Sequence, residues 1–311
     1  MKRFEKLYGR LRRRLPKAKG EVKGRTLSES ELVEVAQILR KIGAVFEVVV
    51  IDIGMHSKEE LLFHKAEQAE AITTHLTSEH HPSVVEAVWM LRRQLEDMPL
   101  QLYVQSVAMG ELVYQTLNHA STYFAFRIPS ELGEYHWRID GKDRLKITRW
   151  EKWWSTVVLP MLESKTFRDP LIAVEGGDYR WQEQFRKRPD DYKLAYVKDA
   201  EKGEFFDLGT VIAKNFCFSS VPEFGLEAVD IVTNAIRRSL SGNFTRAGWI
   251  EIPKLMIHRQ SHCIRLITLS RDSTISDRIP YANVLRDFRH GGRAMFPRWY
   301  YEKREGVDGA R

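Results

Sequence analysis

Apolar positions recur at helical spacing along much of the chain. In GLEAVDIVTNAIRRSLSG, residues 225–242, this spacing predicts a helix with one apolar face made of Leu226, Val229, Val232, Ile236 and Leu240. Residues 27–43 show the same period and predict a helix that begins at Ser28 or Ser30 and stops at Gly43. Further helices are predicted over 57–76, 82–97, 102–120 and 148–164, the last of them kinked or ended at Pro160.

Runs of β-branched and aromatic residues separate these helices. The Val/Ile-rich run AVFEVVVIDIG, residues 44–54, predicts a strand that is buried on both faces. Residues 135–141 predict a short strand that ends in a turn, and residues 192–197 and 213–220 each fit a strand or a loop. Strands that alternate with helices predict the α/β class.

The composition is that of an ordinary soluble globular protein. The chain has 311 residues, of which 43% are hydrophobic and 29% charged. No apolar run approaches the roughly 20 residues of a membrane span, so no membrane partner is expected. The two cysteines, Cys217 and Cys263, match neither a disulfide framework nor a metal-binding spacing, and a reducing cytoplasm is the expected compartment.

The positive charge is concentrated at the N-terminus. Residues 1–25 hold eleven Lys and Arg against two Glu, a balance of +9, which leaves −2 for the rest of a chain with net charge +7. The spacing of Phe4, Tyr8 and Leu11 predicts a basic amphipathic helix, followed by a loop. Contact with a phosphate backbone and simple docking with a basic outer face both remain open. Phosphate contact would use Arg12, Arg13, Arg14, Lys17 and Lys19, together with Arg237 and Arg238 on the later helix.

Three acids occupy positions where sites commonly form. Asp140 ends a predicted strand, Glu21 follows the basic segment, and Asp230 borders the apolar face of the helix over 225–242. If these acids converge, their oxygens suit Mg²⁺ or Mn²⁺. The alternative for Asp230 is an edge carboxylate held by Asn234 or by an arginine. The same positional argument applies to Asp52, Asp143 and Asp178.

Two other clusters have structural interpretations. The histidines of HLTSEHH, residues 75–81, match no standard zinc spacing and favour a helix–loop junction. Trp150, Trp153 and Trp154 predict packing in a core or interface, with base stacking as the alternative. No glycine-rich phosphate loop or nucleophile elbow occurs in the sequence.

Three stretches, taken in order, resemble the motifs of one family. They are GEVKGRTLS at 20–28, YHWRIDGKD at 135–143 and FSSVPEFGLEAVDIVTNAIRR at 218–238. The chain resembles the large bacterial family called domain of unknown function 3800 over most of residues 1–242. The resemblance implies a ribonuclease H-like fold, a mixed sheet flanked by helices. A core over 1–245 would then carry a helical insertion at about 57–125 and a C-terminal extension at 246–311.

The family motifs transfer to particular residues of this chain. The Glu-x-Lys-Gly motif falls on residues 21–24, the strand ending in Asp falls on Ile139-Asp140, and Gly-Leu-Gln-x-Ala-Asp falls on residues 225–230. Glu227 stands where the family has Gln, and Val229 stands where it has Ala. The resemblance implies Glu21, Asp140 and Asp230 as ligands of Mg²⁺ or Mn²⁺. It also implies Lys23 and Lys142 as phosphate contacts, with pairing to adjacent acids as the alternative.

The function implied by this resemblance is metal-dependent hydrolysis of nucleic acid phosphodiesters. The family begins with an acidic strand that has no counterpart here, so the sheet is expected to be truncated and catalysis weak or absent. A start assigned too late, a fragment, and a protein that works without this strand are the open explanations. The first alternative is a non-catalytic nucleic-acid-binding protein on the same fold. The second is an interaction protein whose basic helix and Trp-rich segments contact a partner.

Overall fold

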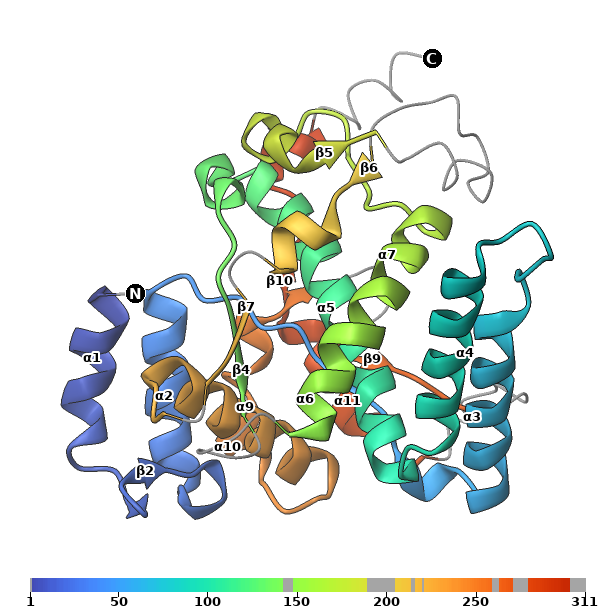
Figure 1. The fold of residues 1–311 in the computed structure, drawn as a ribbon. Helices are drawn as coiled ribbons and strands as arrows, with labels where there is room; N and C mark the ends of the chain where they lie inside the picture. The colour runs from blue at the N-terminus through green and yellow to red at the C-terminus, as the bar shows by residue number, and fades with distance from the viewer. Residues whose placement is uncertain are drawn as a thin grey trace.

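The structure of the chain is a computed structural model. It describes residues 2–141, 148–188, 205–213, 216–219, 221–258, 263–270 and 279–302. The predictions made for Lys142, Asp143 and residues 192–197 lie outside these ranges. Helices and short strands, both parallel and antiparallel, make up the described part, which confirms the α/β class (Figure 1).

The helices occupy most of the predicted segments. They are α1 (Lys2–Arg12), α2 (Glu29–Lys41), α3 (Lys58–Thr73), α4 (Pro82–Glu96), α5 (Leu100–Ala125), α6 (Arg149–Trp153), α7 (Leu159–Arg168), α9 (Phe224–Leu240), α10 (Arg246–Trp249) and α11 (Ala282–Gly291). The strands are β1 (Lys17–Ala18), β2 (Glu21–Val22), β3 (Val49–Val50), β4 (Trp137–Asp140), β5 (Arg186–Lys187), β6 (Phe205–Phe206), β7 (Phe216–Ser219), β8 (Ile257–His258), β9 (Arg265–Leu266) and β10 (Arg293–Ala294).

Local capping signals set the ends of several helices. Ser28 is the N-cap of α2 and forms a capping box with Glu31, while Gly43 follows the helix with φ +77°. His81 caps α4, where its imidazole accepts the backbone N–H of Ser83 at 3.3 Å. The histidine-rich stretch before α4 therefore forms a helix–loop junction, as its spacing predicted.

The helix predicted to kink or end at Pro160 changes its geometry a few residues before that proline. A π-helical turn over Trp154–Val158 joins α6 to α7, and Pro160 falls in the first turn of α7. A proline has no N–H to donate within a helix, and the π-helical turn just before it marks the resulting irregularity. The three tryptophans of this region are all buried, which confirms that they pack in a core.

The described strands form five two-stranded sheets. β4 pairs with β7, β3 with β9 and β8 with β10 in parallel, whereas β1 pairs with β2 and β5 with β6 in antiparallel. Among the described strands, these pairs do not join into the one mixed sheet that the family resemblance implied. The expected burial of residues 44–54 on both faces is wrong, because residues 44–52 are all only half-buried and Ile53 and Gly54 are exposed.

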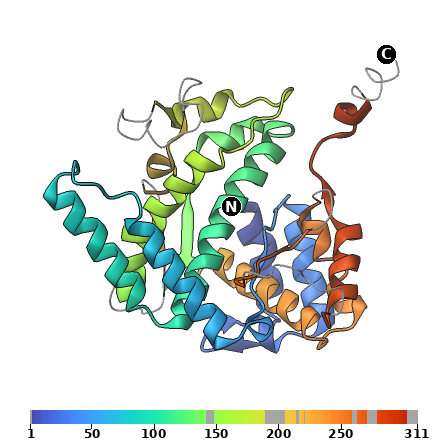
Figure 2. The same ribbon diagram turned by 90° about the vertical axis from the view of Figure 1, so that its right-hand side faces the viewer.

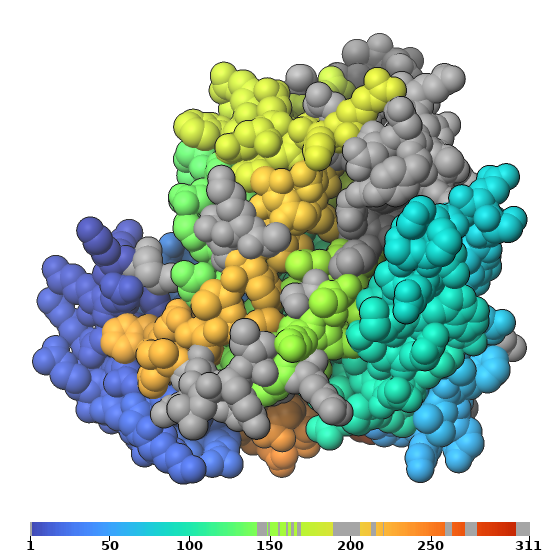
Figure 3. All heavy atoms as spheres, viewed as in Figure 1, coloured from blue at the N-terminus to red at the C-terminus, as the bar shows by residue number. Residues whose placement is uncertain are grey.

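Two large hydrophobic cores and one smaller cluster around Phe126 hold the described elements together. The first packs α1, α2 and α9 against C-terminal segments, and its buried members include Tyr8, Val35, Ile231, Trp249 and Phe288. The second packs α3 to α7. Figure 1 shows α1 and α2 at the left of the molecule and the α3–α4 pair at the right, the side that faces the viewer in Figure 2. The same separation appears on the surface in Figure 3. None of the described helices is long and apolar enough to cross a membrane.

Candidate acidic site around Lys23

A tight hairpin carries the first motif to α9. Lys19 and Gly20 both have positive φ, +53° and +84°, and they close a two-residue loop between β1 and β2. Positive φ at both loop residues matches the twist of an antiparallel pair. Val22 is fully buried and anchors β2, so that Glu21 and Lys23 on either side of it are held near the surface.

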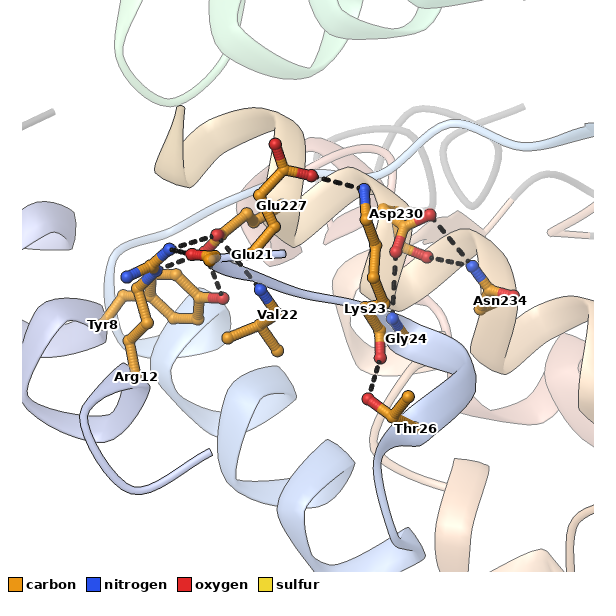
Figure 4. Close-up of polar contacts among 11 residues, drawn as sticks. Tyr8, Arg12, Glu21, Val22, Lys23, Gly24, Thr26, Glu227, Asp230 and Asn234 are labelled. Atoms are coloured by element: carbon orange, nitrogen blue, oxygen red, sulfur yellow. Dashed lines mark hydrogen bonds and ion pairs between the residues drawn. The ribbon is translucent and has the colours of Figure 1, made fainter. Parts of the chain in front are cut away.

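Gly24 allows the turn after β2 to touch the backbone of α9. A Cβ atom built on Gly24 would lie 2.7 Å from Cβ of Asn234, 2.8 Å from Cα of Ile231 and 2.9 Å from the carbonyl oxygen of Asp230. Only glycine fits so close an approach. The contact brings the Gly24 N–H to 2.9 Å from Oδ2 of Asp230, to which it donates a hydrogen bond (Figure 4).

Asp230 is held by its own helix as well as by this turn. Nδ2 of Asn234 donates to Oδ1 of Asp230 at 3.1 Å, as the edge-carboxylate interpretation predicted. Arg237 does not bind the acid directly in this arrangement but donates to Oδ1 of Asn234 at 3.2 Å. The carboxylate of Asp230 therefore faces the residues 21–24 turn and has a defined orientation.

Lys23 interacts with all three predicted acids, through one ion pair and two longer-range charge effects. Its Nζ lies 2.6 Å from Oε2 of Glu21. The hydrogen bond and the charge of Glu21 raise the pKa of Lys23, and the charges of Asp230 and Asp140 raise it further. Such an effect requires proximity, because exposed charges are screened beyond about 10 Å. Acids that are far apart in sequence thus act on one ammonium group.

Asp140 reaches this region through the β4–β7 pair. It lies opposite Ser219 in the parallel register, at the carboxyl ends of both strands, and β7 leads directly into α9. Carboxyl ends of parallel strands are where ligand sites form in α/β proteins. Glu151 is a further acid nearby: it is buried, and its Oε1 lies 3.4 Å from a Cβ atom built on Gly141.

The donor chemistry of Glu21, Asp140 and Asp230 suits a hard divalent cation, because all three offer carboxylate oxygens. In the part of the chain that the structure describes, no three His, Cys, Asp or Glu side chains gather closely enough to form a metal site. The ammonium group of Lys23 supplies the positive charge among these acids. A cation at this position would therefore compete with the Lys23–Glu21 ion pair.

Glu227 has a structural role that the sequence analysis did not identify. It is 5% exposed and accepts hydrogen bonds from Arg12 Nε at 2.7 Å and Nη2 at 2.6 Å, from the Tyr8 hydroxyl at 3.0 Å and from the Val22 N–H at 3.2 Å. Burial and this carboxylate raise the pKa of Tyr8 above its usual value. A buried carboxylate with four donors is fully compensated. Glu227 therefore joins α1 and β2 to α9.

The seven basic residues predicted to contact nucleic acid differ in their surroundings. Arg12 is bound by Glu227, and Arg238 donates to the Leu27 carbonyl at 2.8 Å and stacks 3.6 Å from the centroid of the Phe244 ring. These two side chains serve internal packing. Arg14 is exposed and pairs with Glu34. The other four are exposed to solvent: Arg13, Lys17, Lys19 and Arg237.

No family model, curated protein or solved structure matches this chain. The resemblance to the family called domain of unknown function 3800 therefore rests on the three sequence motifs. The geometry brings Glu21, Lys23 and Asp230 together and places Asp140 within electrostatic reach of Lys23.

Proposed function

We propose that the chain is a ribonuclease H-like, metal-dependent phosphodiester hydrolase whose site contains Glu21, Asp140 and Asp230. The observation that carries the proposal is the ion pair of Lys23 with Glu21 beside Asp230, with Asp140 near enough to raise the pKa of Lys23. Acidic side chains near a basic group at the carboxyl ends of parallel strands are typical of functional sites.

Each residue has a defined task in this proposal. Glu21, Asp140 and Asp230 would hold Mg²⁺ or Mn²⁺, which supplies Lewis acidity for in-line hydrolysis. Gly24 and Asn234 hold the Asp230 carboxylate in place through their hydrogen bonds. Lys23 offers an ammonium group that can leave Glu21 for a phosphate oxygen of the substrate.

The test is metal-dependent cleavage of labelled single- and double-stranded DNA and RNA. Asp230→Asn should lower cleavage at least about a hundredfold, because a lost metal-binding carboxylate removes several kcal/mol of transition-state stabilisation. Asn can still accept the Gly24 N–H, so the fold should persist by circular dichroism and thermal unfolding. Asp97→Asn is the matched control, since Asp97 is an exposed acid just after α4.

Direct binding of Mn²⁺, followed by electron paramagnetic resonance of the ion, gives a readout independent of turnover. Asp230→Asn should weaken this binding, and Asp97→Asn should leave it unchanged. Wild-type protein that binds no Mn²⁺ and cleaves none of the four substrates would contradict the proposal. Equal cleavage rates for the wild type and Asp230→Asn would show that Asp230 is not part of the catalytic site.

The basic surface at the N-terminus supports a second candidate, non-catalytic binding of nucleic acid. The exposed cations of α1 and the segment after it are Lys2, Arg3, Lys6, Arg10, Arg13, Arg14, Lys17, Lys19 and Arg25. Such a surface attracts phosphate without base specificity. This candidate predicts binding that is unchanged by EDTA and by Asp230→Asn, which distinguishes it from the hydrolase.

A further inference from the structure

Residues 45–52, which include the two-residue strand β3, line an open groove. The groove has a volume of about 980 Å³ and lies between this segment, α5 and the C-terminal half of α9. Its walls include Leu112, Val229 and Ile236. A run as rich in Val and Ile as VFEVVVI is typical of strands with a neighbour on each side. Here the segment is half-exposed throughout.

Within the described residues, strand hydrogen bonds pair the backbone of this segment on one side. Arg265 donates to the Val48 carbonyl at 3.0 Å and Ile267 donates to the Val50 carbonyl at 2.9 Å, in the parallel ladder with β9. Backbone groups of alternate residues in a strand point to opposite sides. The N–H and C=O of Val49 therefore point away from β9. Among the described strands, β9 is the single neighbour of β3.

The wall opposite β3 also exposes apolar surface. Val229 is 50% exposed, although its helical position placed it in the predicted apolar face of α9. That prediction is wrong for Val229, because α9 buries a face centred on Ala228, Ile231 and Ala235. Val229 lies instead on the groove side of the helix. Side chains that enter beside β3 would thus meet an apolar wall.

We propose that this groove binds an extended apolar segment of a partner polypeptide, which adds a strand to β3. A strand edge binds a peptide through hydrogen bonds to the peptide backbone. Apolar walls beside the edge favour apolar side chains at alternate positions of that peptide. Segment 45–51 spans roughly 23 Å at about 3.3 Å per residue, the length of a seven-residue peptide. Residues of α5 and α9 line the groove beside this segment.

The charge at the groove predicts an acidic residue in the partner segment. Arg237 is exposed, lines the groove and is hydrogen-bonded to a neutral amide, that of Asn234. The acids of the lining are already engaged: Glu47 contacts His119 at 2.9 Å, and Asp52 accepts the Tyr281 hydroxyl at 2.7 Å. A carboxylate at one end of the bound strand would pair with Arg237.

The first experiment measures binding of a fluorescein-labelled peptide by anisotropy. The probe has seven residues that alternate Val with Thr, followed by one Asp. Two further probes carry N-methyl groups on the Val residues or on the Thr residues. Since strand addition uses the N–H groups of alternate residues, one N-methylated probe should bind at least about tenfold more weakly, a change worth ~1.4 kcal/mol. The other should bind within about twofold of the parent probe.

The second experiment changes the wall of the groove. Val229→Arg should weaken binding of the parent probe at least about tenfold, because a charged side chain then occupies the apolar wall. Val221→Arg is the matched control: Val221 is 68% exposed and does not line the groove. The control should bind as the wild type does, and both variants should retain the circular dichroism spectrum of the folded protein.

Three outcomes would overturn the proposal. The parent probe could show no saturable binding, or both N-methylated probes could bind as tightly as the parent, which would exclude strand addition. Light scattering could instead show a dimer that Val229→Arg converts to a monomer. In that case a second copy of the chain, rather than a partner polypeptide, covers the groove.

Discussion

At the scale of single residues, His119 illustrates how burial changes a titrating group. Nδ1 of His119 lies 2.9 Å from Oε2 of Glu47, and the two side chains are 12% and 8% exposed. The pKa of His119 is lowered to about 4, chiefly by burial and also by the positive charge of Arg265. The negative charge of Glu111 acts in the opposite direction. The neutral imidazole is therefore the form that the folded state favours.

This shift predicts that acid destabilises the protein through His119. The pKa of His119 is lower in the folded state than the usual 6.5, so the unfolded chain takes up a proton first as the pH falls. The stability it contributes is present above pH 6.5 and is lost as the pH falls toward 4. By linkage, the loss between pH 8 and pH 5 is about 2 kcal/mol.

Urea unfolding of the wild type and His119→Gln at both pH values checks this prediction. Gln keeps an N–H donor for Glu47 and does not titrate, while the other acids titrate equally in both proteins. The wild type should lose about 2 kcal/mol more than the variant between pH 8 and pH 5. If the attraction of Glu47 for a charged imidazole dominates, the wild type will instead gain stability relative to the variant.

At the scale of elements, the contact between Gly24 and α9 positions the candidate site. Gly24→Ala places a methyl group within 3 Å of the α9 backbone, so the unfolding free energy should fall by about 1–3 kcal/mol. Gly225→Ala is the matched control, because a Cβ atom there meets nothing within 4 Å and alanine favours the helix. Urea unfolding of both variants tests the contact, and equal stability would show that the turn after β2 can move away from α9 without cost.

The ends of helices were predictable because their signals are local. Ser28, Gly43 and the Pro82 that follows His81 define their helix ends through the backbone of the same few residues. The buried face of α9 was not predictable in the same way. Ala228 and Glu227 are buried while Val229 is exposed, since the elements packed on α9 decide which face is covered.

The candidate site was predictable only through the order of its motifs. Sequence spacing alone could not show that the turn after Glu21 reaches Asp230, because the Gly24–Asp230 hydrogen bond depends on the hairpin, on Gly24 and on the packing of α9. The role of Glu227 was missed for a related reason. Its four donors come from α1 and β2, and nothing in the helix sequence indicates that these elements pack there.

At the scale of the whole molecule, the uneven charge distribution is the most prominent property. The first 25 residues carry a balance of +9, and the remaining residues sum to −2. The buried Phe4, Tyr8 and Leu11 pack α1 into the first core, which leaves the basic side chains on the outside of one edge of the molecule. Figure 3 shows these N-terminal residues at the opposite side of the visible face from α4.

This arrangement predicts nucleic acid binding that falls steeply with salt. Each phosphate contact contributes about 0.9 to the slope of log K against log salt for duplex DNA, so Arg13→Gln with Lys17→Gln should lower the slope by roughly two. Lys58→Gln with Arg93→Gln removes the same charge from exposed positions on α3 and α4 and serves as the control. Anisotropy titrations of a labelled duplex over a range of NaCl concentrations provide the measurement. Equal slopes for the two double variants would mean that net charge, rather than the N-terminal surface, attracts the phosphates, and α1 would then be a docked helix with a basic outer face.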